Sequence, residues 1–122
     1  MPKIVDHDQR RRDLSLVTQR IIVRQGFAGA TMRDIAAEAG YANGAIRRYF
    51  ESKADLIAAT YLNVVDATND RIRWATRDLT GLAALEAFAR EMFPINDVLH
   101  DEARVVVFFW GEVAQSERLV RI

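Results

Sequence analysis

Residues 31–50 read TMRDIAAEAGYANGAIRRYF and carry the strongest structural signal in the chain. Thr31 and Asp34 have the spacing of a capping box with aspartate in place of glutamate. In such a box the threonine oxygen accepts from the backbone N–H of Asp34, and Asp34 reaches back. The pattern predicts a short helix over residues 32–39. Gly40 ends this helix, because glycine tolerates the left-handed conformation that follows a helix.

A second short helix is expected to run through about Tyr49, after a turn over residues 40–43. Two short helices joined by a tight turn that contains glycine form the helix-turn-helix pattern. We expect Ala36 and Gly44 to lie where the two helices cross, because larger side chains there would push the helices apart.

Further helices are expected on both sides of this unit. Leu14, Val17 and Ile21 recur at spacings of three and four, which predicts a helix over residues 10–25. Ser52 and Asp55 form a second capping box. From there a long helix is predicted to run to about residue 77, a length of roughly 36 Å.

Two more helices are predicted after a break at Thr80-Gly81. Residues 82–93 are amphipathic and end before Pro94, and residues 97–119 have a strongly apolar centre. The β-branched residues in that centre would also suit a strand. The acidic start of the segment, its length and its helical surroundings favour a helix. The predicted fold class is therefore all-α.

Composition and charge exclude several classes of protein. The 122 residues include no cysteine, which excludes a disulfide framework and a thiolate zinc site. No segment has the roughly 18 consecutive apolar residues of a membrane span, and the polar N-terminus lacks the apolar part of a signal peptide. We expect a soluble cytoplasmic protein without a cofactor. Residues 1–60 carry ten Lys and Arg against seven Asp and Glu, and residues 61–122 the reverse, which suggests that the first half faces nucleic acid.

The chain shows no arrangement typical of catalysis or metal binding. Its three serines lack the context of a nucleophile, and His7 and His100 are too far apart for a ligand pair. Asp97, Asp101 and Glu102 are more typical of a solvated helix start than of a metal site. No glycine-rich phosphate loop follows a strand. We therefore predict that the protein is not an enzyme and holds no metal.

The runs GFAGATMRDIAAEAG at residues 26–40 and NGAIRRYFESKADL at residues 43–56 resemble the two halves of the TetR-family DNA-binding domain. With the preceding helix, the resemblance covers about residues 10–60. It implies a three-helix, helix-turn-helix DNA-binding head over residues 1–55, joined by the long helix to a partial helical regulatory and dimerisation domain over residues 56–122. It also implies a sequence-specific transcriptional regulator, usually a repressor. In that family an effector moves the long helix, which separates the recognition helices and releases the DNA.

The resemblance further implies which residues meet DNA. Thr31 would cap its helix and present backbone N–H groups to a phosphate, since helix N-termini attract anions. Tyr49 and Lys53 would meet further phosphates. The expected DNA-binding residues are Thr31, Arg33, Asn43, Gly44, Ala45, Arg47, Arg48, Tyr49 and Lys53. The expected core of the head includes Ile46, Phe50 and Leu56.

Two positions depart from the family pattern, and several alternatives stay open. Ala42 replaces the usual serine or threonine, so the recognition helix lacks its usual cap unless Asn43 supplies one. Arg47 replaces an aromatic residue and reaches either phosphate or a guanine edge. A solvated helix face is the alternative for Arg47 and Arg48, and a protein-interaction adaptor on the same fold is the alternative function. Residues 10–12, all arginine, form either an arm near DNA or a disordered charged terminus.

The run from Leu82 to Trp110 resembles, more weakly, the regulatory part of the BetI-type branch of the family. The candidate pocket residues are Trp74, Phe109 and Trp110, with ordinary core packing as the alternative. An aromatic pocket suits a quaternary ammonium effector through cation–π attraction. The implied partners are double-stranded operator DNA, a small-molecule effector and a second copy of the chain, with no membrane. Family members are considerably longer, so a fragment, a truncated product and a shortened member with another dimer surface all remain open.

Overall fold

The computed structural model describes residues 3–115 apart from residues 27 and 43, with side chains from residue 7 onward. These residues form helices and no strand, which confirms the all-α prediction. In chain order the helices are α1 (Lys3–Gln25), α2 (Met32–Ala39), the 3-10 helix η1 (Ala45–Arg48), α3 (Lys53–Thr76), α4 (Gly81–Met92) and α5 (Asp97–Val113).

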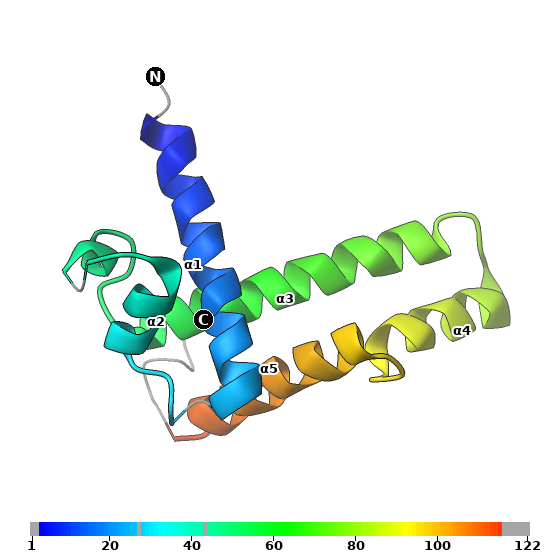
Figure 1. Cartoon of the computed structure of the whole chain (residues 1–122). Coiled ribbons are helices and arrows are strands. Elements are labelled where there is room, and N and C mark those ends of the chain that lie inside the picture. Colours follow the sequence, from blue (N-terminus) through cyan, green and yellow to red (C-terminus); the bar gives the residue numbers. More distant parts are fainter. Residues whose placement is uncertain (1–2, 27, 43, 116–122) are drawn as a thin grey trace.

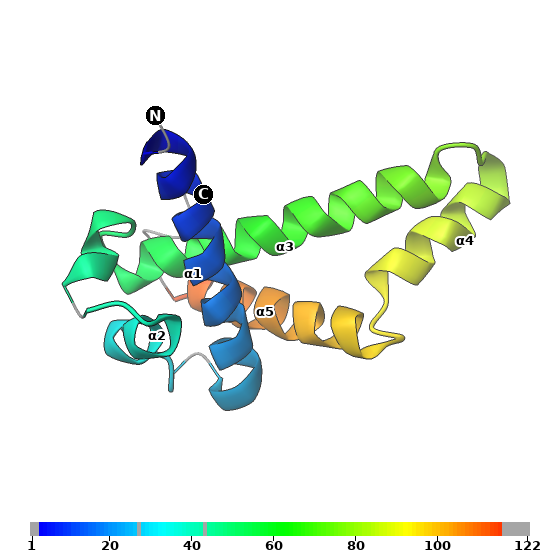
Figure 2. The same cartoon turned by 45° about the horizontal axis from the view of Figure 1, so that its top comes forward.

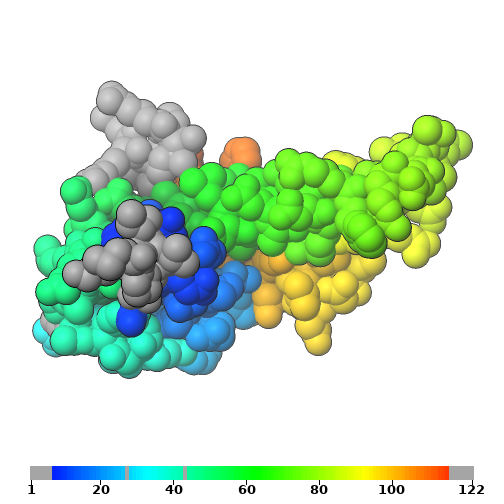
Figure 3. Space-filling model, turned by 90° about the horizontal axis from the view of Figure 1, so that it is seen from above, coloured from blue at the N-terminus to red at the C-terminus, as the bar shows by residue number. Residues whose placement is uncertain are grey.

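The helices form a head and an arm (Figure 1). We call α1, α2, η1 and the first turn of α3 the head, and the rest of α3 with α4 and α5 the arm. Helix α3 runs out from the head, α4 folds back beside it, and α5 returns to the C-terminal end of α1 (Figures 1 and 2). The space-filling view shows the arm projecting beyond the head (Figure 3).

The head encloses an apolar core. Its buried members are Leu14, Val17, Ile21, Ala30, Ile35, Ala36, Ile46, Phe50 and Leu56. The sequence-based core assignment of Ile46, Phe50 and Leu56 is thus confirmed. Helix α1 begins at Lys3, a full two turns before the predicted start, since no glycine or proline interrupts residues 3–25.

The predicted helix ends are found at most positions. The Ser52 side chain accepts from the backbone N–H of Asp55 at 3.2 Å at the start of α3, as the capping box predicts. Asn96 caps α5 in the same way, accepting from the Leu99 N–H at 2.9 Å. Thr80 precedes α4 but its side chain makes no capping hydrogen bond. Helix α4 therefore starts without the side-chain support that α3 and α5 have.

Two smaller clusters hold the helices of the arm, and the first of them joins the arm to the head. Ile22 of α1 packs with Val64 of α3 and Val105 of α5. Ile57 and Ala58 of α3 pack with Phe109 of α5. Helix α5 ends at Val113, whereas the sequence predicts a helix to residue 119. The prediction for Ala114 and Gln115 is wrong, because Ala114 is the C-cap of α5, and residues 116–119 lie outside the described residues.

Candidate nucleic-acid interface

Thr31, the first of the predicted DNA-binding residues, caps the start of α2. The Thr31 side chain accepts from the backbone N–H of Asp34 at 3.0 Å, as predicted. The return contact differs, because the Asp34 carboxylate accepts from the Thr31 hydroxyl at 2.8 Å. Gly40 ends the helix in the left-handed conformation, with φ 80°. Both ends of α2 are therefore held by contacts that the local sequence specifies.

The recognition segment is shorter and tighter than the sequence predicts. Instead of a short α-helix through Tyr49, it is the four-residue 3-10 helix η1, preceded by Gly44 and without a side-chain cap. Ala42 contributes a backbone carbonyl, which accepts from the Ala45 N–H at 2.9 Å. Gly44 occupies the N-cap position of η1 and has no side chain to cap it, and uncapped first turns lose stability. Asn43 lies outside the described residues, so its base contact and its alternative capping role stay predictions.

Gly44 does not lie at a helix crossing. A Cβ built at Gly44 would meet no atom within 4 Å, so no close approach of another described helix requires glycine there. The expectation for Gly44 is therefore corrected, while Ala36, 1% exposed, is part of the core as expected. The open space over Gly44 leaves the backbone at the start of η1 accessible to a ligand.

The three predicted DNA-binding arginines are exposed and have no partner among the described residues. Arg33 on α2 and Arg47 and Arg48 on η1 are exposed. None of them makes a hydrogen bond or ion pair with another residue in the part of the chain that the structure describes. Ile46, 0% exposed, anchors η1 in the core beside them. Unpaired guanidinium groups on an anchored segment are suited to an anion from outside the protein.

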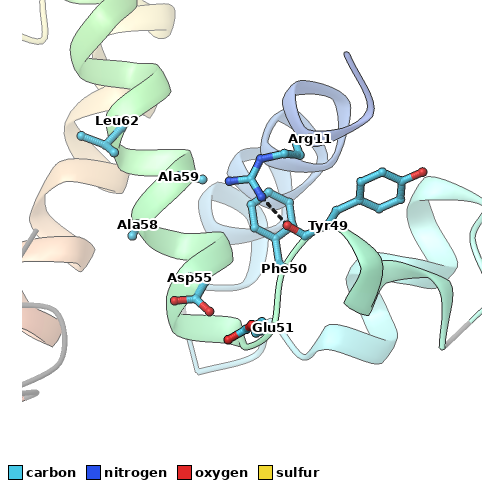
Figure 4. Close-up of a pocket in the computed structure, with 8 residues that line it drawn as sticks. All are labelled: Arg11, Tyr49, Phe50, Glu51, Asp55, Ala58, Ala59 and Leu62. Atoms are coloured by element: carbon cyan, nitrogen blue, oxygen red, sulfur yellow. Dashed lines mark hydrogen bonds between the residues drawn. The ribbon is translucent and has the colours of Figure 1, made fainter. Parts of the chain in front are cut away.

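Tyr49 and Lys53 have different surroundings. The Tyr49 ring is half-buried, edge-on to Tyr41 at 6.1 Å, and turned away from the cavity drawn in Figure 4. Lys53 is also half-buried, and this burial lowers the pKa of its ammonium group while the Glu112 carboxylate of α5 acts in the opposite direction. Lys53 is therefore set between the head and the end of α5, and its phosphate contact stays a prediction.

Arg10 and Arg11 differ from both sequence-based expectations, an arm near DNA and a disordered charged terminus. Both lie within α1 and contact the helix-turn-helix, so they form neither a separate arm nor a disordered terminus. A sequence signal was present. Arg10 and Arg11 precede Leu14 and Ser15 by four residues, and both of those are buried, so the helical period places the arginines over the same face.

The arm contains a cavity of about 350 Å³ between α3, α4 and α5. Its lining is largely apolar and includes Tyr61, Leu99 and Trp110, together with the carboxylates of Glu91 and Glu102. Of the predicted pocket residues, Trp110 lines the cavity. Phe109 lies behind the wall, stacked on Tyr61 at 4.0 Å.

The structure does not bring Trp74 to this cavity. Its side chain is 69% exposed near the end of α3, where the guanidinium of Arg77 stacks on it at 3.6 Å. The expectation for Trp74 is therefore corrected. Helical period alone could not place it, because the cavity depends on where α4 and α5 pack along α3.

One ion-pair network closes the wall of the cavity. Arg71 of α3 donates to Glu102 of α5 at 2.6 and 3.0 Å and to Glu91 of α4 at 3.1 Å. The hydrogen bond to Glu102 is the main reason that the pKa of the Arg71 guanidinium is raised. One cation faces two carboxylates, so the network keeps an excess of negative charge beside the cavity.

Residues 17–60 match the sequence profile described as bacterial regulatory proteins, tetR family. The chain is 39% identical over 98 residues to the HTH-type transcriptional regulator PksA of Bacillus subtilis, which covers 80% of this chain and 48% of the relative. It is 30% identical over 125 residues to the HTH-type transcriptional regulator BetI 2 of Chromohalobacter salexigens, covering 100% of this chain and 60% of the relative.

Among solved structures, the fold is similar to that of a transcriptional regulator from Saccharomonospora viridis in complex with choline. The TM-score is 0.85 at 24% identity, and the match covers 93% of this chain and 60% of the other. The chain thus spans roughly half to three fifths of the length of the relatives it matches. No helix in the described part of the chain is long and apolar enough to cross a membrane.

Proposed function

Because residues 17–60 belong to the TetR family of bacterial regulatory proteins, we propose that the protein binds double-stranded operator DNA through α2 and η1 and regulates transcription. The observation that carries this proposal is the set of exposed, unpaired arginines on these two elements. Lysine and arginine contacts to phosphates supply most of the affinity in such complexes. Arg47 and Arg48 on η1 are also candidates to reach a guanine edge in the major groove.

We infer that the protein acts as a homodimer in the bacterial cytoplasm and represses its target genes. One recognition segment of four residues reads few bases, and two copies on a two-fold operator increase both affinity and specificity. The remaining predicted contacts, Asn43, Gly44 and Ala45, would meet base edges at the start of η1, and Thr31, Tyr49 and Lys53 would meet phosphates.

We further propose that the cavity of the arm binds a small cationic effector. Trp110 supplies an aromatic face, and the network of Arg71 with Glu91 and Glu102 leaves a negative excess beside it. Both features favour a quaternary ammonium group. Choline, which the Saccharomonospora viridis regulator holds, is a suitable first probe. Helix α3 links the cavity to the head, so a ligand that displaces α3 would move η1.

Fluorescence anisotropy tests the DNA-binding proposal, with a duplex from upstream of the protein's own gene and a scrambled duplex at several salt concentrations. We expect selective binding that weakens with salt. Replacing both Arg47 and Arg48 with alanine should lower the salt slope by about two, because each lost phosphate contact removes about one. The matched control replaces Arg73 and Arg90 with alanine, which removes the same charge from arginines paired on the arm.

The outcomes separate the two candidate functions. Absence of binding to either duplex at low salt would exclude the DNA-binding function and favour a protein-interaction adaptor. If the Arg47 and Arg48 variant retains the wild-type affinity and slope, these residues are a solvated helix face. Equal weak binding to both duplexes would indicate a head that lacks its dimer geometry.

Tryptophan emission tests the effector site, since the chain contains two tryptophans. In Trp74→Phe the emission comes from Trp110, which lines the cavity, and in Trp110→Phe it comes from Trp74, which does not line it; both side chains are exposed. We expect choline to change the emission of Trp74→Phe and to weaken its DNA binding, with no emission change in Trp110→Phe. Equal responses from both variants would contradict a site in this cavity.

A further inference from the structure

The side chain of Arg11 links α1 to the end of the recognition helix. Its guanidinium donates to the backbone carbonyl of Tyr49, the residue that ends η1 (Figure 4). The same group lies over the ring of Phe50, 4.3 Å from its centroid. Phe50 is 2% exposed and belongs to the core of the head. Arg11 thus contacts both the last residue of η1 and the core residue that follows it.

The neighbouring Arg10 makes a corresponding contact before the recognition helix. Its guanidinium donates to the hydroxyl of Tyr41 at 2.9 Å and lies 5.6 Å from the centroid of the Tyr41 ring. Tyr41 follows Gly40, which ends α2, and its ring is edge-on to that of Tyr49. Two successive arginines of α1 therefore contact residues on either side of η1.

Helix η1 has little internal support of its own. It has four residues, no side-chain cap, and a start at Gly44 over open space. A cavity of about 350 Å³ lies beside its end, lined by Arg11, Phe50, Asp55 and Leu62 among others (Figure 4). A guanidinium that donates to a free carbonyl at a helix end is favourable for both hydrogen bonding and the helix dipole.

We propose that Arg11, assisted by Arg10, is a positioning residue that holds η1 in the orientation needed for DNA recognition. The proposal rests on the DNA-binding function proposed above. Arg11 acts through the Tyr49 carbonyl rather than through a phosphate, because its guanidinium is directed into the head. Loss of Arg11 removes none of the predicted phosphate contacts but lets η1, which carries Arg47 and Arg48, move relative to α2.

Arg12 provides a matched control on the same helix. Arg12 is exposed. Its guanidinium donates to the side chain of Gln9, on the same helix, at 3.1 Å. Arg11→Ala and Arg12→Ala therefore remove the same charge from adjacent positions, and they differ in the contact with η1. Arg11→Lys retains a cation that is able to donate to the Tyr49 carbonyl.

The experiment measures DNA affinity at several salt concentrations for the wild type, Arg11→Ala, Arg11→Lys and Arg12→Ala. Thermal unfolding identifies a temperature at which all four proteins are folded, and the binding is measured there. We expect Arg11→Ala to bind about tenfold more weakly, the effect of losing one charge-assisted hydrogen bond, with an unchanged salt slope. Arg12→Ala should stay within about twofold of wild type, and Arg11→Lys should recover part of the loss.

Three other results would contradict the positioning role of Arg11. If folded Arg11→Ala binds as well as Arg12→Ala, Arg11 contributes only to stability. If its salt slope falls by about one, Arg11 is itself a phosphate contact. In both cases the wild type still binds, so the proposed function stands. A wild type that binds no duplex overturns the proposed function and the positioning role together.

Discussion

The head and the arm expose opposite kinds of surface. In the head most large apolar side chains are enclosed, with Leu16 exposed, while Arg33, Arg47 and Arg48 have no partner among the described residues. In the arm every arginine of α3 and α4, and Arg77 directly after α3, is near a carboxylate. These paired arginines are Arg71, Arg73, Arg77 and Arg90.

Large apolar side chains are more exposed in the arm than in the head. No residue of α4 is buried, and Leu82 and Leu85 on this helix are 84% and 60% exposed. Unpaired cations attract polyanions, whereas exposed apolar surface associates with apolar groups. The two regions are therefore suited to different partners, DNA for the head and an apolar or amphipathic partner for the arm.

Core truncation gives the largest expected difference between the two regions. Leu56 lies in the head and is 0% exposed. Leu56→Ala should lower the unfolding free energy of the protein by about 2–5 kcal/mol, because apolar burial is lost and a cavity is left behind. Leu85→Ala on α4 is the control, with an expected change within about 0.5 kcal/mol. Urea denaturation measures both. An equal loss in the two variants would mean that α4 is covered in solution.

Removal of the arm's central cation has an intermediate expected effect. Arg71→Met leaves the buried Glu102 carboxylate without its guanidinium and should lower the unfolding free energy by about 1–3 kcal/mol. Arg73→Met is the control, because the pair of Arg73 with Asp70 is exposed and contributes within about 0.5 kcal/mol. Similar urea midpoints for both variants would show that the Arg71 network does not join α3 to α4 and α5.

Helix capping gives the smallest expected effect. Ser52→Ala removes the side-chain acceptor at the start of α3 and should lower the unfolding free energy by about 1 kcal/mol. Thr80→Ala is the matched control on the arm, since the Thr80 side chain makes no capping hydrogen bond and its loss should change little. A larger loss at Thr80 than at Ser52 in thermal unfolding would contradict the difference between the capped and uncapped helices.

Much of the head could be predicted from the sequence, whereas less of the arm could. The caps at Thr31 and Ser52 and the stop at Gly40 follow from side chains that contact the backbone within four residues. The 3-10 form of η1 was missed, although Ala42 indicated a missing cap. The open position of Gly44 was missed because a small residue in a turn indicates close packing and free space equally well.

Short-range patterns were sufficient for the helices, their caps and the core face of the head, because these depend on neighbours in the chain and on the helical period. The contacts that define the candidate sites depend on residues far apart in sequence. Arg11 contacts Tyr49 across 38 residues, and Arg71 contacts Glu102 across 31. Likewise, only the packing of α4 and α5 against α3 shows that Trp110 lines the cavity of the arm and Trp74 does not. Such contacts required the folded chain, because helix packing sets which side chains meet and no local pattern encodes it.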